Sequence, residues 1–208
     1  MELQNVDMLM ADSAIPVDVQ QVLSASRLGE IEHSERHGNE TAGFVPSNPE
    51  VVYRALRAVD LRCAGEASFC EWGSGLGTAT CLAAKLGFRA CGIEIHPQLV
   101  DASRRLAKKF QLPAVFAEGS FVPKSRRSLS WEAYSDNEGR YPWLQCDGPD
   151  AYQSLGMKPA SFDVVFAYPW PGEEYYMSQL FHELARPGSM FLRYVDSGEI
   201  RLLRKPLI

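Results

Sequence analysis

The sequence predicts an α/β fold with a mostly parallel central sheet of about six strands and helices on both faces. Three observations predict it. Short apolar runs alternate with segments of helical periodicity, a glycine-rich turn follows the first of these runs, and 208 residues suffice for one domain with a substantial core. Strands that alternate with helices are typical of parallel sheets, because each helix carries the chain back to the edge where the next strand begins.

Residues 1–47 are expected to form an acidic N-terminal arm, and residues 48–208 the domain itself. Residues 1–50 hold nine Asp/Glu against two Lys/Arg, a net charge of −7, which leaves +2 for the remainder. One short helix is expected around residues 17–28, followed by the charged stretch GEIEHSERHGNETAG, and we expect neither to contribute to the core. The charge balance disfavours nucleic acid as a partner, since binding to phosphate backbones requires basic surface.

The composition predicts no metal centre and no membrane span. His33 and His37 stand four residues apart, as two ligands on one helical face would, but no HExxH pattern or third strong ligand accompanies them. No apolar run approaches the roughly 18 residues that a membrane span needs. The first residues, MELQNVDMLMADSAIP, lack the basic and apolar regions of an export signal, and the five cysteines form no CxxC pair. We therefore expect a cytoplasmic protein with reduced thiols.

The elements are expected in a regular order from residue 48. Asn48-Pro49-Glu50 is typical of a helix start, with a capping side chain, a proline in the first turn and an acid that suits the helix dipole, and it predicts a helix to about residue 60. The predicted strands are SFCE (68–71), ACGIEI (90–95), AVFA (114–117), FDVVFAY (162–168), MFLRYV (190–195) and GEIRLLRK (198–205). The helices between them are expected at 78–86, 97–110 and 175–184.

An insertion of about residues 122–160 interrupts this order before the fourth strand. It is rich in Ser, Asp, Gly and Pro and shows no periodicity. Connections of this length are uncommon in compact domains unless they have a function or are disordered. Five aromatic residues argue for partial order, because disordered segments are poor in aromatics: Trp131, Tyr134, Tyr141, Trp143 and Tyr152. A lid over a ligand site and an insertion without function both remain open.

The turn EWGSGLG, residues 71–77, lies at the carboxyl end of the first predicted strand, where open α/β sheets bind ligands. Its three alternate glycines allow a tight turn and a close approach of the backbone to a ligand. A dinucleotide fingerprint would read GxGxxG and bind a pyrophosphate, whereas the carboxylate of Glu71 beside this loop repels phosphate. The pattern favours a ligand with a cationic group, such as the ammonium of an amino acid.

EWGSGLG resembles motif I, (D/E)xGxGxG, of the class I, Rossmann-like S-adenosylmethionine-dependent methyltransferases. GIEIHP is similar to the strand end where this family binds the ribose through an acid, and a carboxylate can accept from both ribose hydroxyls. LARPGSMFLRY is similar to the family's Pro-Gly turn before the fifth strand. The resemblance covers roughly residues 48–195 and implies S-adenosylmethionine as the cofactor. The cofactor-binding residues it implies are Glu71, Gly73, Ser74, Gly75, Gly77, Glu94 and Ser120, the last in place of an adenine-contacting acid.

The segment AYPWPGEEYY follows the fourth predicted strand, where this family places methyl-acceptor groups. Members that methylate amide or exocyclic nitrogens carry (D/N/S)PP(Y/F/W) here, whereas this chain has Ala167 at the polar first position. We take Tyr168 and Trp170 as candidate catalytic residues. An aromatic pocket around an amine is one interpretation and an aromatic turn that packs on the sheet is the other. Further members of such a pocket would be Tyr175 and Tyr176, with Glu173 and Glu174 attracting the cation.

The function expected from these residues is methyl transfer from S-adenosylmethionine to a protein side chain or small amine rather than to nucleic acid. Transfer would be direct, so that the protein supplies orientation and a desolvated site. Two alternatives remain open. The first is a non-catalytic cofactor-binding or partner-binding module of the same fold, which Ala167 permits. The second is an NAD(P)-dependent oxidoreductase, which the GxGxG spacing and Glu71 disfavour.

Overall fold

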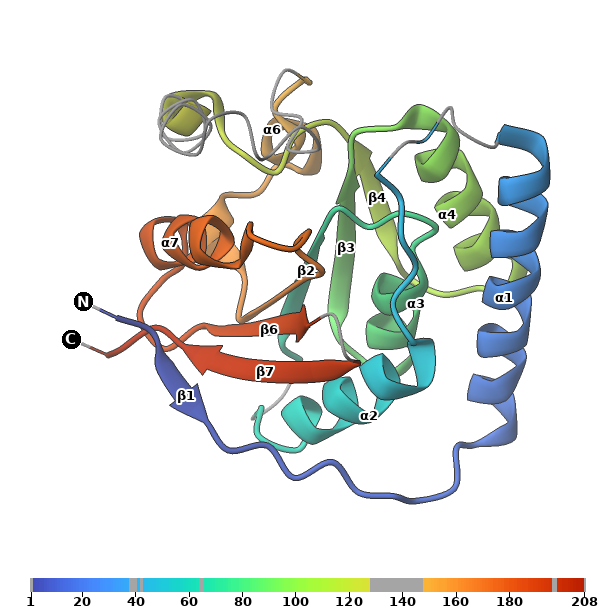
Figure 1. Cartoon of the computed structure of the whole chain (residues 1–208), viewed down its shortest axis with the longest axis horizontal. Coiled ribbons are helices and arrows are strands. Elements are labelled where there is room, and N and C mark those ends of the chain that lie inside the picture. The colour runs from blue at the N-terminus through green and yellow to red at the C-terminus, as the bar shows by residue number, and fades with distance from the viewer. Residues whose placement is uncertain are drawn as a thin grey trace.

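The structure is a computed structural model that describes residues 2–37, 41, 43–63, 66–127, 148–195 and 198–207. A seven-stranded sheet forms its centre, in the order β1-β7-β6-β5-β2-β3-β4 (Figure 1). The strands are β1 (Gln4–Val6), β2 (Ser68–Trp72), β3 (Arg89–Glu94), β4 (Val115–Glu118), β5 (Val164–Ala167), β6 (Met190–Val195) and β7 (Glu199–Arg204). The α/β fold with a mostly parallel sheet is as the sequence predicted.

Five adjacent strands, β6, β5, β2, β3 and β4, run parallel, while β7 is antiparallel to β6 and to β1. The strand order changes direction at β2, which pairs with β3 on one side and with β5 on the other. In this register Trp72, the last residue of β2, lies between Ile93 and Ala167. The carboxyl ends of these strands therefore meet at a topological switch point, where open α/β sheets bind ligands.

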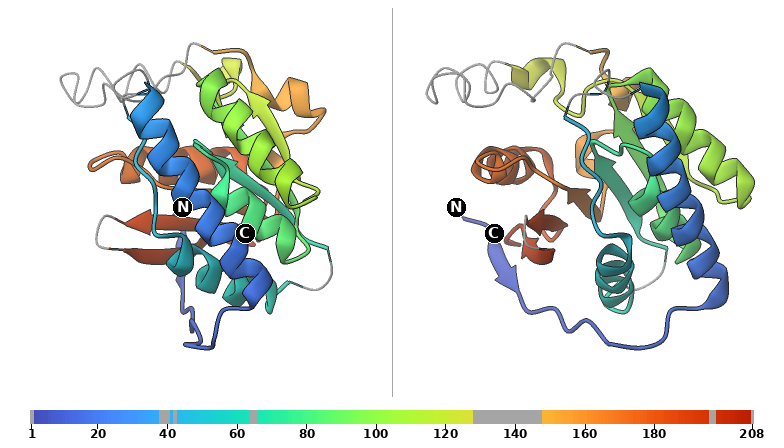
Figure 2. Two further views of the ribbon diagram at one scale, coloured as in Figure 1. Left: turned by 90° about the vertical axis from the view of Figure 1, so that its right-hand side faces the viewer. Right: turned by 45° about the vertical axis from the view of Figure 1, so that its right-hand side comes forward.

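Helices cover both faces of the sheet (Figure 2). One face carries α1 (Val17–His37), α2 (Pro49–Asp60), α3 (Thr78–Lys85) and α4 (Pro97–Lys109), and the other α6 (Ala151–Leu155) and α7 (Glu174–Leu184). Two short 3-10 helices are η2 (Lys124–Arg126) and η3 (Pro159–Ser161). Strand β5 shows why two cores form: Val164 and Phe166 point to one face, and Val165 and Ala167 to the other. All four are buried, as a central parallel strand requires.

The helix starts follow from local chemistry. The side chain of Asn48 accepts from the backbone N–H groups of Glu50 and Val51, so the predicted cap of α2 is confirmed. Helix α3 has no side-chain cap, because its N-cap residue is Gly77, which takes a left-handed conformation with φ of 77°. Such a turn suits glycine, and it redirects the chain from the loop into the helix.

The N-terminal segment differs from the expected arm. The helix around residues 17–28 extends over 21 residues as α1, and its residues Val19, Val22 and Leu23 are buried in the core against α3 and α4. Their i, i+3, i+4 spacing forms a narrow apolar stripe in an otherwise polar helix. The expectation that this segment contributes nothing to the core was therefore wrong. It also supplies β1, which is why the sheet has seven strands rather than six.

Only the ends of the predicted insertion belong to the described residues. Residues 128–147, and with them Trp131, Tyr134, Tyr141 and Trp143, lie outside these residues. The returning end reaches β4, where Asp150 forms a parallel bridge with Ser120 and caps α6 through its side chain. Within the described part of the chain, no helix has the length and the apolar character that a bilayer span requires.

Candidate functional site

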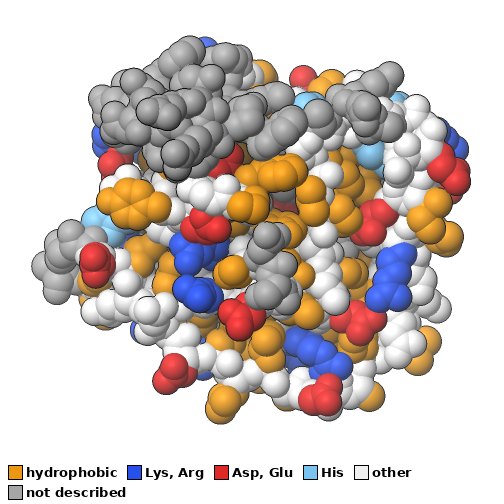
Figure 3. Space-filling model, in the orientation of Figure 1, with side chains coloured by type: hydrophobic (Ala, Val, Ile, Leu, Met, Phe, Trp, Pro, Cys, Tyr) orange, Lys and Arg blue, Asp and Glu red, His pale blue; other side chains and the backbone are white. Residues whose placement is uncertain are grey.

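A cavity of about 140 Å³ lies at the switch point, against the carboxyl ends of β2, β3, β4 and β5. Figure 3 shows hydrophobic side chains gathered around a hollow on this face. The cavity brings predicted cofactor-binding residues and predicted acceptor residues into one wall. Its lining includes Gly43, Phe44, Val45, Gly73, Glu94, Ile95, His96, Gly119, Ser120, Phe121, Tyr168, Pro169, Trp170 and Glu173.

Glu71 lies beneath the glycine loop rather than in the cavity wall. Its carboxylate accepts from the backbone N–H of Thr80 at 2.9 Å and from the Thr80 hydroxyl, so it holds the first turn of α3. Burial raises the pKa of Glu71 to about 8, although the hydrogen bonds from Thr80 oppose that shift. The structure thus gives this predicted cofactor residue a role in joining β2 to α3.

The glycines of the loop have different neighbours. A Cβ on Gly77 would meet Ser103 at 2.5 Å and the ring of Phe116 at 2.7 Å, both in the core. A Cβ on Gly75, where φ is 51°, would collide with the ring of Phe44. Gly73 is open on that side and lines the cavity. Gly77 therefore serves core packing, whereas Gly73 and Gly75 serve the approach to the cavity.

Ser74 also lies below the loop. Its backbone N–H, like that of Gly73, donates to the carbonyl oxygen of Ile93, which pins the loop to the end of β3. Its hydroxyl is buried and has no hydrogen-bond partner, and it lies close to the Cα of Gly92. Any side chain at Gly92 would therefore displace Ser74 from under the loop.

Glu94 enters the cavity wall from the end of β3. One carboxylate oxygen accepts from the Gly75 N–H at 2.8 Å, and the other from the Ile95 and His96 N–H groups at 2.8 and 3.0 Å. The residue is only 7% exposed. A carboxylate has about four acceptor positions, so three are used and one remains, on the oxygen that faces Gly75. Glu94 is therefore a structural link between two strand ends as well as a group that can accept from a ligand.

Ser120 takes the corresponding place at the end of β4. Its hydroxyl oxygen accepts from the Val122 N–H at 3.0 Å, and its backbone N–H donates to the carbonyl oxygen of Pro149. The hydroxyl proton is left to donate toward the cavity. Next to it, Gly119 is held so close to the Pro149 carbonyl that a side chain would not fit. The insertion thereby fixes the geometry of this strand end.

The N-terminal segment covers the cavity, which the sequence did not indicate. Phe44 lies over Gly75 and makes an edge-on contact with the ring of His33 on α1, 5.8 Å between centroids. The carbonyl oxygen of Gly43 accepts from the indole N–H of Trp170 at 3.0 Å. His33 is buried, shares a hydrogen bond with the Thr41 hydroxyl, and its pKa is lowered mainly by burial. No periodicity or motif marks Phe44, since its role comes from a chain crossing.

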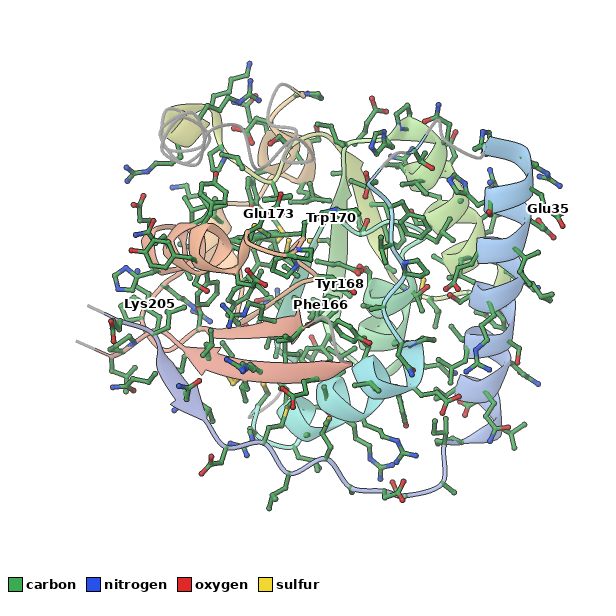
Figure 4. The ribbon with its side chains drawn as sticks, viewed as in Figure 1. Glu35, Phe166, Tyr168, Trp170, Glu173 and Lys205 are labelled. Carbon is green, nitrogen blue, oxygen red and sulfur yellow. The ribbon has the colours of Figure 1, made fainter. Side chains whose placement is uncertain are left out.

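The acceptor side contains two of the four predicted aromatic residues. Tyr168 packs on Tyr194 with 4.6 Å between ring centroids, and Trp170 lies beside it (Figure 4). Tyr175 is 72% exposed, and its hydroxyl oxygen accepts a hydrogen bond from the side chain of Gln179. Tyr176 is buried in the core below α7. Neither of these two lines the cavity, so the four-membered aromatic pocket is not formed.

An apolar groove of about 240 Å³ adjoins the cavity on this side. Five of the six residues that line the groove also line the cavity, so the two are neighbouring parts of one recess. The sixth is Pro171, and the shared residues are Gly43, Val45, Tyr168, Pro169 and Trp170. None of the described residues that line the groove has a charged side chain.

Glu173 lies at the start of α7 and reaches the cavity from the acceptor side (Figure 4). One carboxylate oxygen accepts from the Trp170 N–H at 3.2 Å, while the other is buried without a hydrogen-bond partner. The residue is 5% exposed, and burial raises its pKa to about 7. Arg193 on the adjacent β6 donates instead to the Glu174 carbonyl oxygen and to Ser178. Glu174, unlike Glu173, does not line the cavity.

The other predicted features lie elsewhere. A second cavity, of about 220 Å³ between α1 and α4, is lined in part by Arg36, Arg105 and Lys109 and contains none of the predicted site residues. His33 and His37 are in ring contact, 4.9 Å between centroids. Within the described ranges, no group of three or more His, Cys, Asp or Glu is arranged to hold a metal ion.

Comparison with solved structures identifies the fold. The chain resembles an RNA methyltransferase from Salinibacter ruber in complex with S-adenosylhomocysteine, with 20% identity, a TM-score of 0.52, and 78% of this chain and 94% of that one aligned. It also resembles an O-methyltransferase from Bacillus cereus in complex with the same compound, with 15% identity, a TM-score of 0.52, and 90% and 71% aligned. A putative O-methyltransferase from Klebsiella pneumoniae aligns at 16% identity and a TM-score of 0.50, over 89% and 69%.

No protein-family model matches the sequence, and no curated protein matches it. The likeness is therefore one of architecture and not of sequence. The chain has the Rossmann-like fold of the class I S-adenosylmethionine-dependent methyltransferases.

Proposed function

We propose that this protein is an S-adenosylmethionine-dependent methyltransferase that acts on an amine of a protein side chain or small molecule. One observation carries the proposal. A single recess has the glycine loop and Glu94 on one side, and Tyr168, Trp170 and Glu173 on the other. A cofactor and an acceptor can meet there in one desolvated space, which is what direct transfer needs. Two of the three similar structures named above were solved with S-adenosylhomocysteine.

The charges of the recess fit a sulfonium cofactor. Two buried carboxyl groups, Glu94 and Glu173, line the cavity, and its described lining includes no Lys or Arg. Such a site attracts a cation and repels the pyrophosphate of a dinucleotide. When bound, the sulfonium would supply an electrophilic methyl group. Glu94 would accept from a ribose hydroxyl through its remaining position, and Ser120 would donate toward the adenine end.

The size of the cavity implies a movement of the covering segment. Sites for small molecules usually measure about 300–1,000 Å³, whereas this cavity measures about 140 Å³. Residues 43–45 belong to neither a strand nor a helix, and Phe44 among them lies over Gly75 of the glycine loop. We therefore propose that this segment moves outward when the cofactor enters and then packs on it.

The acceptor side favours an amine over a nucleic acid. Ala167 offers no side-chain hydrogen bond to an exocyclic base nitrogen, and the described lining of the groove includes no basic residue that would bind phosphate. One similar structure is an RNA methyltransferase, so RNA belongs in the acceptor screen as a counter-test. The cytoplasmic location expected from the sequence stays a prediction.

A non-catalytic cofactor-binding or partner-binding module is the second candidate. Ala167 favours it, because a buried methyl group occupies the position where related enzymes have a polar residue to hold the acceptor. Methyl transfer to any acceptor would separate the two functions.

The proposal is tested by calorimetry with S-adenosylmethionine, S-adenosylhomocysteine and NADH, followed by transfer of a labelled methyl group to amines, peptides and RNA. We expect both methionine compounds to bind, NADH not to bind, and an amine to be methylated. Heat from NADH, with none from the methionine compounds, would contradict the cofactor assignment.

A further inference from the structure

We propose that Glu173 selects the methyl acceptor: it binds a protonated amine at the inner end of the apolar groove and takes up the proton that the nitrogen must lose before it is methylated. This inference rests on the proposed function and adds to it the acceptor chemistry and the residue that recognises it. Its basis is the placement of one unsatisfied carboxylate oxygen in the wall of the recess.

The buried carboxyl group of Glu173 lacks a cationic partner among the described residues. A buried carboxyl group ordinarily has a cationic partner or a full set of hydrogen bonds, because burial of an unpaired charge is costly. Among the described residues, the Glu173 carboxylate accepts one hydrogen bond, from the Trp170 N–H, and the charge that acts on it is the like charge of Glu174. Arg193 on β6 donates through Nη1 to the Glu174 carbonyl oxygen and to Ser178, and it does not contribute to the pKa shift of Glu173. A cationic ligand would supply the counter-charge that the described residues do not give Glu173.

The route to the unbonded carboxylate oxygen of Glu173 is an apolar groove. The groove is lined by Tyr168, Pro169, Trp170 and Pro171, and the cavity that contains Glu173 shares most of that wall. An apolar stem with a single charged end fits such a passage, as the methylene chain and ammonium group of a lysine side chain do. Tyr168 and Trp170 would add attraction between a cation and their aromatic faces.

The acid strength of Glu173 suits it to accept a proton from an amine. An alkylammonium ion near pKa 10 has no lone pair with which to attack a methyl carbon, so it must first lose a proton. Burial raises the pKa of Glu173 to about 7, which makes its carboxylate a better base than an exposed Glu at neutral pH. Among the described residues, the other titratable groups around this point are Glu94, His96 and Tyr168 in the cavity wall, Glu174 beside it and Arg193 on β6.

The proposed proton and methyl transfers conserve atoms and charge. Glu173 takes one proton from the ammonium group, and the freed nitrogen lone pair forms a bond to the methyl carbon of the sulfonium donor. The carbon–sulfur bond breaks, and its electron pair stays on sulfur, which becomes a neutral thioether. The products are a methylated ammonium ion, a protonated Glu173 carboxyl group and the thioether, so the total charge is unchanged.

The carboxylate could instead pair with the sulfonium of the cofactor, and this alternative is an outcome of the test. A counter-ion of the sulfonium would strengthen binding of S-adenosylmethionine but not of its neutral product. Under our proposal Glu173→Gln leaves the ratio of the two affinities within about twofold of the wild-type ratio. A selective loss of S-adenosylmethionine affinity, by tenfold or more, would overturn it.

The main experiment follows the Glu173 carboxyl carbon by NMR in protein labelled with carbon-13 at glutamate, with the signal assigned through Glu173→Gln. The probes are n-butylammonium and, as its neutral counterpart, n-butanol, with and without S-adenosylhomocysteine. We expect n-butylammonium to lower the pKa of Glu173 by about one unit or more, as an opposite charge in contact does, and n-butanol not to lower it. An unchanged pKa, or an equal effect of both probes, would overturn the proposal.

Kinetics supply the second readout, with the best amine from the acceptor screen as substrate. Glu173→Gln should lower kcat by about 100-fold or more, the usual scale for loss of a base. It should also move the rising limb of the pH profile of kcat/KM, which reports the free enzyme, from near 7 toward the pKa of the amine. The matched control is Glu174→Gln, which makes the same charge change outside the cavity wall. It should leave kcat within about twofold and, because it removes a like charge that raises the pKa of Glu173, move the rising limb only slightly toward lower pH. Equal effects of the two variants would contradict the proposal.

Failure of the proposed function gives a different pattern. If S-adenosylhomocysteine does not bind, the cofactor assignment is wrong, yet the response of Glu173 to n-butylammonium is still measured in the free protein. Thermal melting of Glu173→Gln shows whether that variant is folded. The NMR titration itself uses the wild-type side chain and does not depend on it.

Discussion

The polar groups on the two sides of the recess differ in how fully they are hydrogen-bonded. On the β3 and β4 side, the side-chain oxygens of Glu94 and Ser120 accept hydrogen bonds from backbone N–H groups of the loops that follow β2, β3 and β4. On the β5 side, Ala167 offers no polar group and Glu173 keeps one buried oxygen unbonded. One side is therefore held in place by its own backbone, and the other keeps polar capacity for a second molecule. Variants can test this contrast separately on each side.

The largest effect is expected from Gly77→Val, with Gly75→Val as its counterpart in the same loop. A side chain at Gly77 strains a left-handed residue and collides with Ser103 and Phe116 in the core, so the free energy of unfolding should fall by about 3–5 kcal/mol. A side chain at Gly75 meets only the movable ring of Phe44, and we expect a loss nearer 1–2 kcal/mol.

Urea denaturation measures both losses, and calorimetry measures S-adenosylhomocysteine binding to Gly75→Val. Binding should be weakened at least tenfold, because the close approach of the loop to the ligand is lost. Equal stability losses in the two variants would show that the loop is not divided between core packing and ligand approach.

Glu94→Gln should lower both stability and cofactor affinity. Both carboxylate oxygens accept from backbone N–H groups, so the amide NH₂ of glutamine would face a donor on one side. We expect a loss of about 1–3 kcal/mol in the free energy of unfolding and roughly tenfold weaker S-adenosylhomocysteine binding. Denaturation and calorimetry on the same preparations measure the two. Weaker binding with unchanged stability would mean that the backbone hydrogen bonds to Glu94 contribute nothing.

Stability should fall as pH rises through the range in which Glu71 ionises. The pKa of Glu71 is raised from about 4.5 to about 8 by burial, so the folded state holds a proton that the unfolded state has released. The contribution is complete below pH 4.5 and is lost toward pH 8, at no more than about 1.4 kcal/mol per pH unit. Glu71→Gln keeps an acceptor for Thr80 and should flatten this slope.

The comparison is the difference between wild type and Glu71→Gln in urea denaturation at pH 5, 6.5 and 8. Other titrating groups, such as His33, cancel in this difference. A wild-type slope identical to that of the variant would contradict the raised pKa.

The smallest effect is expected from Phe44→Ala. Phe44 is partly exposed and its contacts are Gly75 and the ring of His33, so removal should cost about 1 kcal/mol or less in stability. It opens the covering segment, and we expect S-adenosylhomocysteine to associate faster by a fewfold. Stopped-flow association kinetics would measure it. A slower association would contradict the idea that this segment obstructs entry.

The sequence predicted well what depends on local spacing. The glycine loop, the Asn48 cap and the alternation of apolar runs with helical periods place six of the seven strands, since each signal lies within a few residues of its element. Phe44, β1 and the core role of α1 were missed because they depend on contacts between distant residues. Of the two interpretations left open for AYPWPGEEYY, the four-membered aromatic pocket does not hold, because Tyr175 and Tyr176 belong to α7, where neighbours point in different directions.

The pairing of β1 with β7 joins nearly the first described residues to nearly the last, Asn5 opposite Leu203 (Figure 1). During synthesis residues 4–6 have no partner until residues 202–204 have been made, so the sheet edge is completed last. Contacts so far apart in the chain slow folding, because a long loop must close before they form. Until then β7 presents an open edge to other chains. A peptide with the sequence of the first strand would compete for that edge and delay maturation.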